Sequence, residues 1–263
     1  MTKKFKRLRD CEISLAIKND GFINPPRESQ KNWLLNKALN EFVDDLMNLN
    51  ELSKRFVPGM QSLLLHDRSQ ENLANEEIME DWQKPLMKAM AEVVTTAHGD
   101  VLEIGFGIGV SATYIQEFNV RSHTIIECND FIVQKFKAWR EGYPDSDIRL
   151  VHGKWQDVID DLGAYDGIFF HTYPLTETEH VEQIAQSTTF AEHFFSTAGK
   201  HLKQGGIFTY LTNEIDSLSR GHQRRLFEHF STITQSVYKP LNLPEDIKDA
   251  WWADSMIIIK AIK

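Results

Sequence analysis

A glycine-rich segment in the middle of the chain has the residue types of a ligand-binding loop. Residues 101–109 read Val-Leu-Glu-Ile-Gly-Phe-Gly-Ile-Gly, an apolar strand pattern that runs into a turn just before a predicted helix. Glycine lets a ligand approach the backbone, and the first N–H groups of a helix are free to bind it. A dinucleotide fingerprint would place its last glycine at position 110, whereas this chain has Val110 there and Gly109 before it. The spacing favours an adenosyl ligand without a pyrophosphate.

Two further segments carry polar side chains that suit such a ligand. Glu127 ends the apolar run 124–126, 20 residues after Gly107, where a carboxylate can accept hydrogen bonds from both ribose hydroxyls. The alternative is a solvated acid at a strand end. Trp155 is expected to flank the adenine, and Gln156 or Asp157 to accept from its amine, although either could instead cap a helix.

Short apolar runs separated by helical stretches predict the elements that position these residues. The runs span residues 101–104, 124–127, 148–151, 167–170 and 206–211. Alternating strands and helices are typical of an α/β fold with a mostly parallel sheet and helices on both faces. Two last runs, 233–238 and 256–262, have no room for a crossover helix and predict an antiparallel hairpin. Five parallel strands and a terminal hairpin are the order of a seven-stranded, Rossmann-like class I methyltransferase sheet.

Upstream of the glycine loop, the periodicity is helical. Apolar residues at spacings of three and four predict one helix over 30–57 and another over 75–96, with Pro85 as a kink or break in the second. We expect residues 1–75 to form a helical cap over the crevice and residues 76–263 to form the ligand-binding domain.

Composition narrows the function classes. The 263 residues are 41% hydrophobic and 25% charged, which is typical of a globular protein. The net charge of -9 disfavours nucleic acid as a partner, and no apolar run approaches the ~18 residues of a membrane span. The two cysteines, Cys11 and Cys128, form no zinc or redox motif. We therefore expect a cytoplasmic protein with no bound metal, no nucleic-acid partner and no membrane contact.

Several motifs together resemble guanidinoacetate N-methyltransferase and its arginine-methylating relatives. They are Ile125-Ile126-Glu127-Cys128-Asn129-Asp130, Gly153-x-Trp155-x-Asp157-Val158, Tyr165-Asp166-Gly167-Ile168, Thr172-Tyr173-Pro174-Leu175 and Met79-Glu80-x-Trp82-x-x-Pro85-x-Met87. The resemblance covers roughly residues 76 to 215. It implies S-adenosylmethionine as the methyl donor and S-adenosylhomocysteine as the product. The cofactor contacts it implies are Met87, Phe106, Gly107, Ile108, Gly109, Val110, Ser111, Glu127, Cys128, Asn129, Trp155 and Gln156.

The acceptor side departs from the family pattern. Gln83 stands where the family has a glutamate and His171 where it has an aspartate, and those two family carboxylates hold the guanidinium of the substrate. Because a guanidinium depends on paired carboxylates, losing both should remove that preference. Glu214 stands in place of a threonine near the substrate carboxylate. The expected substrate contacts are Met79, Gln83, His171, Asn213 and Glu214.

These departures lead to an expected function. We expect a methyltransferase for a small-molecule metabolite, with O-methylation of a carboxylate or hydroxyl ahead of N-methylation. The alternatives are N-methylation of a guanidino or amine compound, arginine included, and a noncatalytic protein that binds S-adenosylmethionine. His171, Gln83 and Tyr173 are the candidate catalytic residues, with His171 as a general base or hydrogen-bond donor. The competing interpretations are that His171 is a structural histidine and that Gln83 is an exposed glutamine on a helix. A homodimer is left open.

Overall fold

The computed structural model describes residues 68–176, 179, 187, 189–212, 214–245, 247 and 251–263. The chain divides into two compact units, residues 1–64 and 65–263, and every element below belongs to the second unit. The expected helix over 30–57, nearly all of the expected cap over 1–75, and Asn213 lie outside the described residues.

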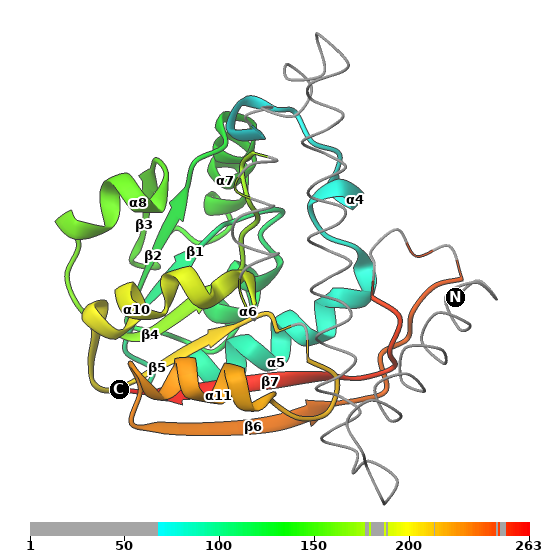
Figure 1. Cartoon of the computed structure of the whole chain (residues 1–263). Helices are drawn as coiled ribbons and strands as arrows, with labels where there is room; N and C mark the ends of the chain where they lie inside the picture. The colour runs from blue at the N-terminus through cyan, green and yellow to red at the C-terminus, as the bar shows by residue number, and fades with distance from the viewer. Residues whose placement is uncertain are drawn as a thin grey trace, which may run out of the picture. The chain divides into compact units, whose positions relative to one another are not determined.

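A seven-stranded sheet forms the centre of the second unit, in the order β3-β2-β1-β4-β5-β7-β6 (Figure 1). The strands are β1 Asp100–Ile104, β2 Ser122–Glu127, β3 Ile148–His152, β4 Tyr165–Phe170, β5 Leu202–Tyr210, β6 Thr232–Tyr238 and β7 Met256–Ile262. Strands β1 to β5 run parallel, and β7 pairs antiparallel with both β5 and β6. The predicted mostly parallel sheet with a terminal hairpin is confirmed.

The strand register brings three loops to one edge of the sheet. Ile104 at the end of β1 pairs with Ile126 of β2 and with Phe170 of β4, so these strands end at the same level. After β1 the chain builds outward to β2 and β3 on one side, and later to β4 and β5 on the other. Such a switch in strand order opens a crevice beyond the carboxyl ends, where ligands of open α/β sheets bind.

Alternating side chains of the strands pack against helices on both faces. Leu102 and Phe170 belong to a core that includes residues of η4 Phe190–Phe194, α10 Phe195–His201 and α11 Arg220–Phe227. Val101 and Phe169 pack with α5 Lys84–Val94 and α6 Val110–Glu117. The helix α7 Asp130–Arg140 packs with α6 and β2. The shorter elements are η1 Arg68–Gln70, α4 Asn75–Ile78, η2 Asp81–Gln83, α8 Trp155–Val158 and η3 Ile159–Asp161. None of the helices in the described part is long and apolar enough to cross a bilayer.

The segment 75–96, predicted as a helical stretch with a kink or break at Pro85, is broken at Met79 and not at the proline. It is divided into α4, η2 and α5, because Met79 is extended with φ -162° and ψ 133°. The Gln83 side chain accepts a hydrogen bond from the Glu80 N–H at 3.2 Å and caps the second turn. Pro85 lies in the first turn of α5, where its missing N–H costs no hydrogen bond. The proline therefore starts a helix and does not kink one.

An ion-pair network closes the opposite edge of the sheet, where β1 and β4 begin. Lys203 Nζ lies 2.8 Å from a carboxylate oxygen of both Asp100 and Asp166. Arg121 also pairs with Asp100, and its hydrogen bond holds the pKa of that carboxyl far below the ordinary range. These charges tie neighbouring strands together at the edge remote from the glycine loop.

Candidate cofactor and acceptor site

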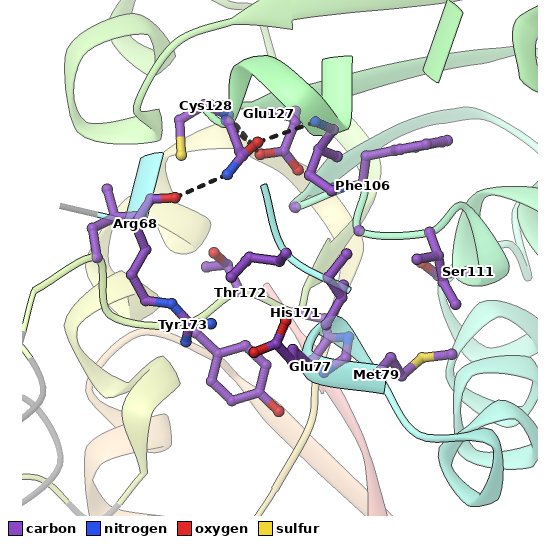
Figure 2. A pocket seen from close by; sticks show the side chains of 18 of the residues that line it. Arg68, Glu77, Met79, Phe106, Ser111, Glu127, Cys128, His171, Thr172 and Tyr173 are labelled. Atoms are coloured by element: carbon purple, nitrogen blue, oxygen red, sulfur yellow. Dashed lines mark hydrogen bonds between the residues drawn. The ribbon is translucent and has the colours of Figure 1, made fainter. Parts of the chain in front are cut away.

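A pocket opens at the carboxyl edge of the sheet, between the loops that follow β1, β2 and β4 (Figure 2). A segment from Arg68 to Met79 forms its remaining wall. Eleven of the residues predicted for the site line this pocket: Met79, Phe106, Gly107, Ile108, Val110, Ser111, Glu127, Cys128, Asn129, His171 and Tyr173. Segments from four places in the sequence therefore share one cavity.

The glycine loop after β1 turns sharply because its glycines adopt left-handed conformations. Gly105, Gly107 and Gly109 have φ values of +88°, +57° and +79°, which side chains other than glycine rarely adopt. A Cβ atom on Gly105 would lie 2.4 Å from the carbonyl oxygen of His171, so glycine lets the loops after β1 and β4 touch. Of the residues that the structure describes, a Cβ atom on Gly107 would meet Ile78 alone, at 3.2 Å. The loop leaves its backbone accessible from the pocket, as a close-fitting ligand requires.

The Glu127 carboxylate is fixed by backbone N–H groups from two loops. Its Oε2 accepts from Phe106 N at 2.9 Å, and its Oε1 accepts from Cys128 N and Asn129 N, both at 2.8 Å. The residue is buried, yet it lines the pocket. Two carboxylate oxygens offer about four acceptor sites, so three N–H groups leave capacity for a hydroxyl. The site thus fits the sugar of a nucleoside.

Asn129 and Ser111 line the pocket but use their side chains within the protein. Asn129 Oδ1 caps α7 by accepting from Phe131 N and Ile132 N, at 2.9 and 3.1 Å. Asn129 Nδ2 donates to the carbonyl of Arg68 at 2.8 Å and to that of Glu71. Ser111 Oγ donates to the buried carboxylate of Glu103. These bonds position the walls of the pocket.

His171 occupies the other end of the pocket, directly after β4. Its backbone N–H donates to the Ile104 carbonyl at 3.1 Å, which continues the pairing of β1 and β4. Burial lowers the pKa of His171 from 6.5 to about 4, so the imidazole is neutral at pH 7. Its Nε2 is shielded from solvent and has no hydrogen-bond partner in the described part of the chain. An unpaired buried nitrogen beside a pocket suits a bond to a ligand.

Tyr173 and Glu77 complete this end of the pocket. The Tyr173 ring lies 5.9 Å from the His171 ring and remains 48% exposed. Figure 2 shows the Glu77 carboxylate between these two rings in projection. Across residues 68–176 and the other described parts, no group of three or more His, Cys, Asp or Glu side chains could hold a metal ion.

Three predicted residues on the helices beside the pocket do not line it. Met87 is fully buried in the core beneath α5. Gln83 is buried, and its amide oxygen caps η2. Gly109 begins α6 as its N-cap, one residue beyond the lining residue Ile108.

Three more predicted residues lie farther along the chain and are also absent from the lining. Trp155 packs edge-on against Phe194, with ring centroids 4.9 Å apart, while Gln156 is exposed. Glu214 Oε1 accepts from Ser219 N at 3.1 Å and lies 3.2 Å from His222 Nδ1. Burial opposes ionisation of Glu214, but the bonds from His222 and Ser219 hold its pKa below the ordinary value. Its carboxylate is thus used to fix the loop before α11.

Sequence reasoning did not select several residues that line the pocket. Arg68 and Leu73 precede the segment with helical periodicity, and nothing in the sequence marked them. Glu77 and Ile78 belong to the predicted helical stretch 75–96, but no motif singled them out as site residues. Ile132 lies just beyond the motif that ends at Asp130, and the remaining ones fall within the motifs. Gly105 belongs to the glycine loop, and Thr172, Pro174 and Leu175 belong to the motif that follows β4.

The architecture and the pocket agree with similarities to known proteins. The structure of M. jannaschii TYW2 in complex with AdoMet aligns with a TM-score of 0.51 at 13% identity, covering 70% of this chain and 76% of that one. The fold is that of class I S-adenosylmethionine-dependent methyltransferases. The family model of guanidinoacetate N-methyltransferase matches residues 65–232. The chain belongs to this family, whose methyl donor is S-adenosylmethionine, and the methyltransferase class predicted from the sequence is confirmed.

Curated relatives carry a related name. Protein arginine N-methyltransferase 2 of Candida glabrata is 32% identical over 118 residues, which are 41% of this chain and 27% of the relative. The protein of the same name from Saccharomyces cerevisiae is 29% identical over 119 residues, again 41% of this chain and 27% of the relative. The chain thus spans about a quarter of the length of these relatives.

Proposed function

We propose that the chain transfers a methyl group from S-adenosylmethionine to a nitrogen of a guanidino or amine acceptor, with the arginine side chain among the candidates. Membership of the guanidinoacetate N-methyltransferase family is the observation that carries this proposal. The names of the relatives support it. Both favour N-methylation over the O-methylation that the loss of two family carboxylates had suggested, and they extend the acceptor from small molecules to protein arginine.

The cofactor half of the pocket binds S-adenosylmethionine and orients it. The glycine loop and Glu127 hold the nucleoside, and the segment anchored by Asn129 covers it. When bound, S-adenosylmethionine would supply a methyl group activated by its sulfonium, and bond formation between the acceptor nitrogen and that carbon would release S-adenosylhomocysteine. The chain must therefore align the acceptor and exclude water, more than it must supply reactive groups.

His171 and Tyr173 act at the acceptor half. The neutral imidazole presents Nε2 as a hydrogen-bonding atom at the end of β4. Because a pKa near 4 makes it a weak base, we assign His171 to accepting a hydrogen bond from the acceptor N–H, and the proton that methylation releases passes to solvent. Tyr173 shields one side of the acceptor from solvent. Gln83 and Glu214 would act on the acceptor only through the residues that line the pocket.

The test is a methyl-transfer assay with labelled S-adenosylmethionine and a set of acceptors. The set contains guanidinoacetate, arginine, an arginine-rich peptide, primary amines, and matched carboxylates and hydroxyl compounds. Each acceptor is assayed separately, because mild base releases methanol from a methyl ester but leaves both an N-methyl group and a methyl ether intact. We expect base-stable label on a nitrogen acceptor. Base-labile label, label on a hydroxyl compound that has no nitrogen, or cofactor binding without turnover on any acceptor would overturn the proposal.

A further inference from the structure

We propose that Glu77 is the acceptor-binding carboxylate of this chain, and that the acceptor presents a cationic group to it, a guanidinium or an ammonium. This inference rests on the proposed N-methyltransferase function and specifies its substrate class. The position is unrelated to the two family carboxylates that Gln83 and His171 replace.

Glu77 faces the acceptor end of the pocket from a short helix. It lies in α4, lines the same cavity as His171 and Tyr173, and is exposed to solvent. One oxygen, Oε2, accepts from Ala74 N at 2.7 Å, which holds the side chain in place. Among the described residues, Oε1 has no partner. A carboxylate fixed through one oxygen can pair with a cation through the other.

The charges around the cavity leave this role to Glu77. Glu77 and Glu127 are the acidic residues of the described lining, and Glu127 is already bound by three backbone N–H groups. Arg68 lies on the same wall, but its Nε donates to Glu71 at 3.3 Å, which offsets its charge. His171 is neutral at pH 7. The net negative charge at the acceptor end therefore comes from Glu77.

The aromatic neighbour strengthens this assignment. Tyr173 lines the same cavity as Glu77 and keeps 48% of its surface exposed. An aromatic face and a carboxylate that line one cavity are a favourable setting for a cation, because the ring quadrupole and the negative charge both attract it. A neutral hydroxyl would gain a hydrogen bond to the carboxylate but no attraction between opposite charges, and a carboxylate would be repelled.

The experiment compares two ligands that differ in charge. Arginine and citrulline, each with its α-amino group acetylated, have nearly the same shape, but citrulline carries a neutral urea in place of the guanidinium, so only the arginine ligand carries a cationic group. Each is titrated calorimetrically into the chain saturated with S-adenosylhomocysteine. We expect the wild type to bind arginine at least about tenfold more tightly than citrulline, as a charge-assisted bond implies.

A matched pair of variants assigns the preference to one residue. Glu77→Gln keeps an oxygen for Ala74 N but removes the charge, while Glu76→Gln makes the same change on an exposed residue of α4 outside the cavity. We expect Glu77→Gln to lose about tenfold in arginine affinity with unchanged S-adenosylhomocysteine affinity, and Glu76→Gln to match the wild type. A wild type that does not prefer arginine, or an unchanged Glu77→Gln, overturns the inference. Failure of the proposed function is separate, since it is the absence of nitrogen methylation in the turnover assay.

Discussion

Replacing Glu127 by glutamine is the change that affects the cofactor half most selectively. The glutamine oxygen can still accept from Cys128 N and Asn129 N, but its NH₂ group then faces Phe106 N, which is a second donor. One buried donor loses its acceptor, at a cost of about 1–3 kcal/mol in the free energy of unfolding. The charge-assisted bond to a ribose hydroxyl is lost as well, and it contributes about 1.5–3 kcal/mol. At about 1.4 kcal/mol per factor of ten, the Kd for S-adenosylmethionine should rise about 10- to 150-fold.

Calorimetry measures this change, with a control elsewhere in the fold. Glu117→Gln makes the same substitution at an exposed position at the end of α6, outside the pocket, and should bind S-adenosylmethionine like the wild type. Far-UV circular dichroism and thermal unfolding check that Glu127→Gln is folded at the temperature of the titration. A folded Glu127→Gln protein whose Kd stays within twofold of the wild type would show that Glu127 does not contact the cofactor.

Three further predictions concern the framework. Gly105→Ala should lower the free energy of unfolding by about 2 kcal/mol or more, because φ is +88° and the new Cβ would lie 2.4 Å from the His171 carbonyl oxygen. The control is Gly163→Ala, which has open space around it and should change thermal unfolding little. Burial lowers the pKa of His171 from 6.5 to about 4, so between these pH values the unfolded chain binds a proton that the folded chain does not bind. The free energy of unfolding should therefore fall by up to roughly 3 kcal/mol as the pH drops from 6.5 to about 4. Denaturant unfolding of His171→Asn should show a shallower loss there, and equal pH slopes would contradict the assignment. Lys203→Met removes the cation bridging two carboxylates 2.8 Å away and should cost about 1 kcal/mol at low salt, falling in 1 M NaCl; a salt-independent cost would point to packing instead.

The sheet could be predicted because each strand carries its own signal. The run Thr124-Ile125-Ile126 is apolar on both faces, as a central parallel strand must be, and its buried side chains match that expectation. The terminal hairpin followed from the short spacing between its two runs. The break at Met79 was missed because apolar periodicity continues across it, while the extended backbone there belongs to the end of α4 and the cap of η2.

The site residues also divide into those that the sequence could predict and those that it could not. Glu127 could be placed from its position at a strand end, since strand ends of a parallel sheet share one edge. Trp155 could not, because whether it turns to the crevice or packs on Phe194 depends on residues nearly 40 positions away. Arg68 and Glu77 could not be placed at the pocket either. Asn129 donates to the Arg68 carbonyl, and Ala74 N donates to the Glu77 carboxylate; such contacts are not visible as periodicity in the sequence.

The most direct test of the account is a crystal structure of the full chain with S-adenosylhomocysteine. We predict the nucleoside over the glycine loop, a ribose hydroxyl bonded to Glu127 and its sulfur directed toward the end of the pocket that His171 and Tyr173 line. A ligand bound outside this pocket, or a sugar that makes no contact with Glu127, would contradict the assignment of the site.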